Sequence, residues 1–182
     1  MGGRGRPGLS QLVFTAMLAA AVCGSSCAEP VRVADLIAQF AEARKQPAST
    51  AFDVADVTID GNTKRSIIAH GQTRLTAHVT VPKHAIFRTS VALHPSVWEQ
   101  PGDGVHLFVG VSDGQAFQTR ASVVVDAFGS PADRRWREVE VNLEEFAGLT
   151  IDIVLNTRAG EADNATVQND IAVWGTPVII AR

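Results

Sequence analysis

Cysteine is scarce in this sequence, and both of its cysteines lie close to one end. Cys23 and Cys27 fall within the first 28 residues, a segment that we expect to be removed on export. The chain that remains then has no disulfide, no thiol nucleophile and no cysteine-ligated zinc, although an exported protein meets oxidising conditions. Its stability must come from the packing of apolar side chains.

An apolar run long enough to cross a bilayer is also missing. The run Leu12–Val22 follows two arginines and is too short for a transmembrane helix, which is the form of a secretory leader. We expect residues 1–28 to be that leader and the protein to be periplasmic or extracellular. Small residues around Cys27 suit ordinary cleavage. Cys23 or Cys27 could instead accept lipid, and such an anchor would be the protein's sole contact with a membrane.

Positive charge is in deficit. Lysine and arginine total 16 against 19 aspartates and glutamates, and the leader contains two of the arginines and no acid. After cleavage 14 basic and 19 acidic side chains remain, a balance of −5 before the termini are counted. Nucleic acid is bound through clusters of cations that neutralise phosphates, so we expect no nucleic-acid partner.

The usual catalytic motifs are missing too. The sequence has no Gly-x-Ser-x-Gly elbow, and its five histidines lack the close spacing of transition-metal ligands. Glu138 and Glu140 lie two apart on one face of an expected strand. Such a pair could serve glycoside hydrolysis, but far more often it keeps a sheet surface soluble. We therefore expect no enzymatic activity and no cofactor other than a structural ion.

Helical periodicity is confined to one segment that follows the leader. Within Val33–Lys45 the apolar residues recur at helical spacing, and two cations stand at the end. We expect one short helix there, which could cover an edge of the sandwich or dock on a neighbouring protein. Residues 29–50 then form a short helix and linker ahead of a single domain at 51–182.

From residue 51 onward the apolar residues alternate with polar ones. Arg74–Val81 is the clearest case, because every second residue is apolar, and turn formers such as Asp60-Gly61 separate the runs. Crossover helices between the runs are missing. About seven to nine short strands of this kind describe an all-β fold, an antiparallel jelly-roll-like β-sandwich with one short N-terminal helix.

Three stretches of the second half resemble a known family. They are Trp136–Gly148, Ile151–Thr157 and Asp170–Ile179, and together with Asp103-Gly104-Val105 they are similar to the closing half of galactose-binding-like jelly-roll domains. The resemblance covers the chain from Thr58 to the end, and it implies a β-sandwich similar to the non-catalytic sugar-binding modules of exported bacterial enzymes. The ligand loops of that family vary, so no binding residue is carried over by position.

The three tryptophans are the most informative residues for a sugar ligand, because the C–H faces of sugar rings stack on indole. Trp98 lies in an expected loop with His94 and Asp103, which combines a flat aromatic with hydrogen-bonding groups at an edge of the sandwich. We take Trp98, His94 and Asp103 as candidate ligand contacts. The alternative is a loop tryptophan that covers the end of the core.

Trp136 is the second candidate platform. Strand parity places it on the same face as Glu138 and Glu140, so an unbulged strand presents the indole to solvent beside two carboxylates. We include Trp136 and Glu138 among the candidate ligand contacts. The alternative is a bulge near the preceding arginines that turns the indole into the core.

A polar loop near the carboxyl terminus could bind a hard cation. Asp163, Asn164 and Asp170 supply the oxygen ligands that calcium prefers, and related sandwiches often carry a structural ion. Their spacing is not that of an EF-hand, and ordinary turn chemistry is the alternative. A structural calcium site is therefore an open expectation.

Two functional hypotheses follow from these patterns. The first is an exported, non-catalytic binding module that recognises a carbohydrate or cell-envelope glycan through loop aromatics, with an enzyme or envelope protein as its partner in trans. The second is a structural or protein–protein interaction domain of the bacterial cell envelope, with every aromatic in the core. An indole face exposed to solvent favours the first, whereas an exposed apolar patch favours the second.

Overall fold

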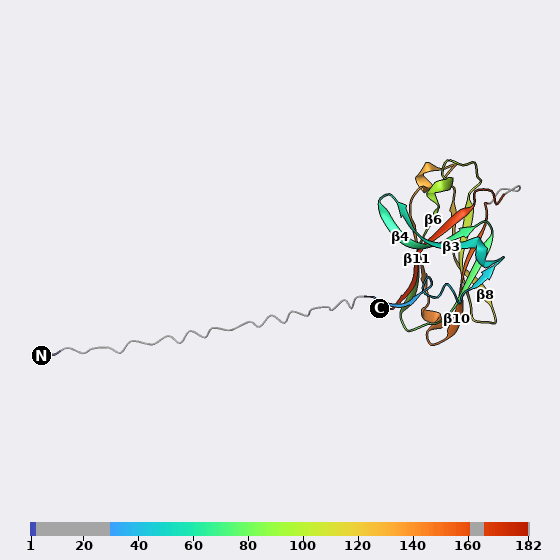
Figure 1. The fold of residues 1–182 in the computed structure, drawn as a ribbon. Coiled ribbons are helices and arrows are strands. Elements are labelled where there is room, and N and C mark those ends of the chain that lie inside the picture. The colour runs from blue at the N-terminus through green and yellow to red at the C-terminus, as the bar shows by residue number, and fades with distance from the viewer. Residues whose placement is uncertain (3–29, 161–165, 182) are drawn as a thin grey trace.

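The computed structural model describes residues 1–2, 30–160 and 166–181, and within them it shows two facing antiparallel sheets (Figure 1). Sheet A contains β1 (Val31–Asp35), β3 (Phe52–Ile59), β4 (Asn62–His70), β6 (Ala85–Leu93), β9 (Arg137–Asn142) and β11 (Ile171–Ala181). Sheet B contains β2 (Arg44–Gln46), β5 (Thr73–Thr80), β7 (Val105–Ser112), β8 (Phe117–Val125) and β10 (Thr150–Ala159). The expected all-β antiparallel sandwich is confirmed. None of the helices among the described residues is long and apolar enough to cross a membrane.

The strand order brings distant parts of the chain together. Sheet A runs β3-β4-β11-β6-β9, with β1 also paired to β11, and sheet B runs β2-β5-β10-β7-β8. The last strand, β11, therefore lies inside sheet A between β4 and β6, as Figure 1 shows. Side chains on the outer face of this sheet come from strands far apart in the sequence.

The core lies between the two sheets and follows the period-two pattern. On β5, Leu75, Ala77 and Val79 are at most 4% exposed and belong to the core, whereas His78 on the other face is exposed and Thr76 on that face is 7% exposed. Phe87 and Trp174 are among the largest fully buried side chains and come from neighbouring strands β6 and β11. Burial of each such side chain stabilises the fold by roughly 1.5–3 kcal/mol.

The amino-terminal segment differs from the expected helix at Val33–Lys45. Strand β1 pairs with β11 and strand β2 pairs with β5, so the segment adds a short strand to each sheet. Residues 36–43 between these strands are turns and a bend. The carboxylate of Asp35 accepts hydrogen bonds from the backbone N–H groups of Ile37 at 2.9 Å and Ala38 at 3.4 Å, which stabilises the first turn.

Tertiary contacts explain this difference. Leu36 is 0% exposed, and its backbone N–H donates to the carbonyl of Pro177 at 3.0 Å. A short isolated helix is marginal in water, whereas β-branched valines suit a strand that extends the hydrogen-bond ladder of β11. The sandwich therefore begins at Val31 and not at residue 51. The leader expected at residues 1–28 lies outside the described residues, apart from the first two.

A tight hairpin between β3 and β4 lies beside the site described below. Asp60 (φ 49°) and Gly61 (φ 72°) both have positive φ angles, which matches a two-residue turn between twisted antiparallel strands. Asn62 follows directly at the start of β4. The backbone of the hairpin tip is thus held in a defined position beside the outer face of sheet A.

Candidate functional site

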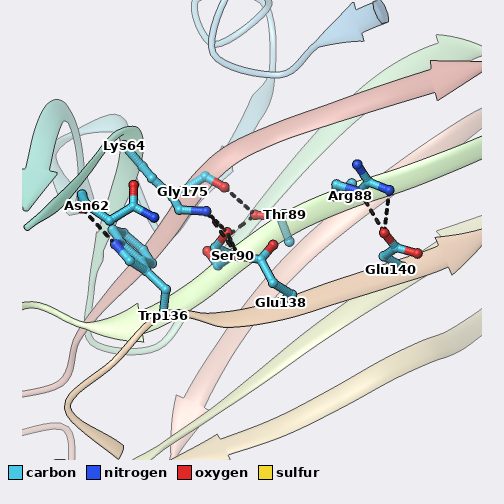
Figure 2. A network of polar contacts seen from close by, with 9 residues as sticks. All are labelled: Asn62, Lys64, Arg88, Thr89, Ser90, Trp136, Glu138, Glu140 and Gly175. Atoms are coloured by element: carbon cyan, nitrogen blue, oxygen red, sulfur yellow. Dashed lines mark hydrogen bonds and ion pairs between the residues drawn. The ribbon is translucent and has the colours of Figure 1, made fainter. Parts of the chain in front are cut away.

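The outer face of sheet A carries the polar and aromatic residues of β9 and of the segment just before it. Val139 and Val141 are buried, while Glu138 and Glu140 are exposed and lie opposite Ser90 and Arg88 of β6. Trp136 shares their face, as Figure 2 shows. Trp136 therefore lies on the outer face, as strand parity predicts. Its indole is not turned into the core between the sheets, which was the alternative.

The indole of Trp136 extends across the sheet from β9 toward β11 and β4. A Cβ atom at Gly175 on β11 would lie 3.0 Å from Cζ3 of Trp136 and 3.0 Å from Cδ of Lys64, so a larger residue there would require these side chains to shift by a few tenths of an ångström. Trp136 Nε1 donates to the carbonyl of Asn62 at 3.0 Å, at the tip of the β3–β4 hairpin (Figure 2). The ring is half-buried and has a fixed orientation.

Three polar side chains form a connected network beside this ring. Lys64 Nζ donates to Ser90 Oγ at 2.6 Å and to Glu138 Oε1 at 3.0 Å, and Ser90 Oγ donates to the same Oε1 at 2.7 Å (Figure 2). Lys64 Nζ also lies 5.6 Å from the centre of the Trp136 ring, within range of a cation–π interaction. The side chain of Glu138 is 58% exposed, so the network reaches the surface.

A second ion pair extends this surface along the sheet. Arg88 Nε donates to Glu140 Oε1 at 2.7 Å, one row beyond the pair formed by Ser90 and Glu138. Arg88, Glu140 and the network of Lys64, Ser90, Glu138 and Trp136 together form the surface that we call the sheet A platform. It presents a flat aromatic and several fixed donors and acceptors on one face.

Trp98 reaches the same face from the loop after β6. Trp98 and Trp136 are both half-buried and both pack against one small buried cluster. Its members alternate along their strands with residues of the main core, so they lie on the outer face of sheet A: Val57, Ile59, Ile68, Ala92 and Val173. The two indoles cover this cluster, and Trp98 also packs against the main core. These contacts fit the alternative for Trp98, a loop tryptophan that covers the end of the core, and its role as a ligand contact stays a prediction.

The polar groups of Trp98 are occupied by the protein. Its Nε1 donates to the carbonyl of Leu93 at 2.9 Å, and its own carbonyl accepts from Arg134 Nη2 at 3.0 Å. The residue follows a short 3₁₀ turn, Pro95–Val97, that holds the loop in place. Trp98 can therefore offer a ligand the exposed part of its ring, but not its N–H group.

His94 acts within the protein as the cap of that 3₁₀ turn. Its Nδ1 accepts from the backbone N–H of Ser96 at 3.3 Å and contacts Ser96 Oγ at 2.8 Å. Partial burial, and then the nearby His70, lower the pKa of His94. A neutral imidazole with one nitrogen engaged is a modest candidate for ligand contact, and the prediction for His94 stays a prediction.

Asp103 is grouped with Asp170 instead of with the platform. Asp103 Oδ2 accepts from the backbone N–H of Thr166 at 2.7 Å, while Asp103 Oδ1 and Asp170 Oδ2 are buried without a hydrogen-bond partner. Asp170 is 4% exposed. Burial, and then the charge of Asp103, raise the pKa of Asp170 to about 7. Among the acidic side chains of the described residues, Asp170 is the one whose pKa is raised.

The calcium ligands expected from the sequence are only partly described. Asp163 and Asn164 lie outside the described residues, and among those described no group of three or more acidic, histidine or cysteine side chains is arranged to hold a metal. Asp103 and Asp170 nevertheless interact electrostatically and each has a buried oxygen without a partner, and carboxylate oxygens are the ligands that a hard cation prefers. A cavity of about 10 Å³ beside Asp170, also lined by Gln100 and Gly102, gives room for little more than one ion or water.

The sequence alone did not single out Lys64 or Ser90. Each reads as an ordinary outward residue of an alternating strand, and their contact with Glu138 depends on the pairing of β4, β11 and β6. Lys64 is 26 residues from Ser90, and Ser90 is 48 residues from Glu138. Strand register across three chain-distant elements cannot be derived from local periodicity.

Comparison with known proteins gives a relative of undefined function. No family model matches the chain. An uncharacterized protein from Archaeoglobus fulgidus is 34% identical over 119 residues, which cover 65% of this chain and 28% of that protein. The chain thus spans well under a third of the length of this relative.

Several solved structures share the fold. CBM51-2, solved with the INT domains of Clostridium perfringens ZmpB, has a TM-score of 0.51 at 19% identity over 76% of this chain and 28% of that chain. CBM51 from Clostridium perfringens GH95, in complex with methyl-galactose, has a TM-score of 0.51 at 12% identity over 76% and 87%. TmCBM61 in complex with β-1,4-galactotriose has a TM-score of 0.50 at 15% identity over 81% and 94%. The chain has the jelly-roll β-sandwich fold of galactose-binding-like domains.

Proposed function

We propose that the chain is a non-catalytic carbohydrate-binding module whose ligand lies across the sheet A platform. The observation that carries the proposal is the half-buried indole of Trp136, fixed beside Lys64, Ser90 and Glu138. The likeness to solved carbohydrate-binding modules, two of them in complex with galactose-containing sugars, supports it.

The chemistry of the platform suits a sugar ring. The C–H face of a pyranose packs on an aromatic ring, while its hydroxyl groups need donors and acceptors whose positions are already fixed. Trp136 offers the ring, and the Lys64 ammonium and the Glu138 carboxylate offer a donor and an acceptor on one side of it. Because these groups are held by each other, binding costs little side-chain ordering.

Binding fits this surface better than hydrolysis. Glu138 and Glu140 are each held by a cation, Lys64 and Arg88 respectively. Both carboxylates are exposed, and the hollow of about 570 Å³ that Glu140 lines is open to solvent, so water is not excluded from a glycosidic bond there. We therefore propose a module that binds a glycan and leaves its chemistry to an enzyme partner in trans.

The test is a glycan-array screen of the purified protein with calcium present, followed by calorimetry on any glycan that binds. We expect Trp136→Ala to weaken binding by about tenfold or more, a loss of about 1.4 kcal/mol, and Trp136→Phe to retain part of the affinity. Glu138→Gln should also weaken it. Phe128→Ala removes an exposed aromatic that is not part of the platform and serves as the matched control.

Two outcomes count against the proposal. If Trp136→Ala and Glu138→Gln bind a glycan as the unaltered protein does, the ligand lies elsewhere. If the protein binds no glycan, the structural or protein-interaction role in the cell envelope becomes the better hypothesis, and Trp98 and Trp136 are then covers of the outer-face cluster.

Export and a calcium ion complete the proposal. We propose that the module acts outside the cytoplasm, in the periplasm or beyond the cell. Cell fractionation, with an antibody to detect the protein in each fraction, would test this.

We also propose that Asp103 and Asp170 hold a structural calcium ion, because each has a buried oxygen without a hydrogen-bond partner and the charge of Asp103 acts on Asp170, an arrangement in which an ionised pair without a cation is costly. Such an ion would tie the loop at Asp103 to the start of β11.

A further inference from the structure

A shallow groove lies on the outer face of sheet B, on the side of the molecule opposite the sheet A platform. Strand register places Gln46 of β2, Arg74 of β5 and Asn156 of β10 in one row across the sheet. The groove, of about 340 Å³, runs along this row and is lined by Gln46, Pro47, Gln72, Arg74, Asn156 and Arg158. Its two arginines present only hydrogen-bond donors, and its three amides present both donors and acceptors.

Aromatic rings position the two arginines of this groove. The guanidinium carbon of Arg74 lies 5.4 Å from the centre of the Phe117 ring, and that of Arg158 lies 5.3 Å from the centre of the Phe108 ring. The Phe117 ring lies against β7, since a Cβ at Gly110 would be 2.4 Å from Phe117 Cζ. A cation–π contact of this kind restrains a guanidinium group and leaves N–H groups at its edge free for a ligand.

These arginines lack the acidic partners that most others have. In the described part of the chain neither Arg74 nor Arg158 forms an ion pair or a hydrogen bond through its side chain. By contrast, six arginines elsewhere each pair with a carboxylate: Arg32, Arg65, Arg88, Arg120, Arg134 and Arg137. The nearest carboxylate on this face of β10, Asp152, contacts His78.

An exposed, uncompensated positive charge is unexpected in this protein. The chain as a whole has a net charge of −3. Arg44 of β2 adds a third cation to the same face, because it lies two residues from Gln46 on the same strand. Amides from Gln46, Gln72 and Asn156 complete a surface that is rich in donors and carries fixed positive charge.

We propose that this groove binds an anionic sugar residue, one that carries a carboxylate or a sulfate group. A planar guanidinium forms two parallel hydrogen bonds to such a group, and two guanidinium groups already restrained by cation–π contacts would hold it at a reduced ordering cost. The neighbouring amides would bind the hydroxyl groups of the same ring. This site is separate from the sheet A platform and does not depend on it.

The experiment measures binding of three probes by calorimetry: trigalacturonate, its methyl ester and galactose 6-sulfate. The methyl ester keeps the sugar chain and removes the charge. We expect trigalacturonate, galactose 6-sulfate or both to bind, and the ester to bind about tenfold more weakly than the acid or worse. The difference should shrink at high salt, because these charges are exposed. Whichever charged probe binds identifies the anionic group.

Two variants in the groove and two controls outside it locate the site. Arg74→Gln and Arg158→Gln should each weaken the binding of the charged probe by about tenfold. Arg65 is an exposed arginine of sheet A, and Arg65→Gln should leave the affinity unchanged. Trp136→Ala should also have none, so failure of the platform and failure of the groove are distinguishable. Thermal unfolding checks that each variant folds. The proposal is overturned if neither charged probe binds, if the ester binds as well as the acid, or if Arg65→Gln weakens binding equally.

Discussion

Asparagine in place of Asp170 is expected to stabilise the protein at alkaline pH. The Asp170 carboxyl is buried and faces the charge of Asp103, which raises its pKa from 3.8 to about 7. The folded state therefore holds this proton more tightly than the unfolded state does. Its contribution to the free energy of unfolding is fully present below about pH 4 and is lost as the pH rises through about 7.

The magnitude follows from the size of the shift. A difference of about three pKa units corresponds to about 4 kcal/mol between the two ends of this range, and relaxation of the loop would reduce it. An asparagine side chain at this position would carry no charge at any pH, so it would not repel the Asp103 carboxylate. The free energy of unfolding of Asp170→Asn should therefore fall much less between about pH 5 and about pH 8.5.

The assay is urea unfolding at about pH 5 and about pH 8.5, with a chelator present, for the unaltered protein and for Asp170→Asn. Asp60→Asn, at an exposed turn residue that accepts a positive φ angle, is the control and should keep the pH slope of the unaltered protein. If Asp170→Asn keeps that slope as well, the buried carboxyl does not titrate as argued. That result would refute the reasoning.

Calcium gives the same experiment a second arm. A bound cation favours the ionised carboxylate, so calcium added at about pH 8.5 should restore stability to the unaltered protein and not to Asp170→Asn. If calcium does not stabilise the unaltered protein, the proposed calcium site is wrong. The electrostatic argument for Asp170 would still hold.

Two further predictions concern packing. Gly175→Ala would press a methyl group against the Trp136 ring, and we expect it to cost about 1–3 kcal/mol of stability and to shift the tryptophan fluorescence; an unchanged spectrum would contradict the placement of that ring. Leu36→Ala should cost about 2–5 kcal/mol in urea unfolding, because Leu36 is 0% exposed; a value near zero would mean that the amino-terminal segment is a detachable linker after all.

Local patterns were sufficient for the strands and their faces. The alternation at Arg74–Val81 predicts which side chains of β5 enter the core, and strand parity predicts that Trp136 and Glu138 share the outer face. The Asp60-Gly61 pair predicts the hairpin turn. These features are local because the side chains of a strand alternate with a period of two and a two-residue turn requires residues that tolerate positive φ.

Local patterns failed where a neighbouring strand decided the outcome. The spacing of apolar residues in Val33–Lys45 is that of a helix, but the edge of β11 offers β1 a hydrogen-bond ladder and the core accepts Leu36 from a turn. Lys64 and Ser90 could not be predicted from the sequence for the same reason. Their contact with Glu138 exists only after β4, β11 and β6 have paired.

The sequence by itself determined the all-β sandwich and the faces of its strands, because both follow from side-chain alternation within a few residues. Only the tertiary structure decided which of those faces meet. It joined Trp136 to the β3–β4 hairpin, set Asp103 beside Asp170, and gathered unpaired arginines on sheet B. Such juxtapositions depend on strand order and register, and these are set by the packing of the whole chain.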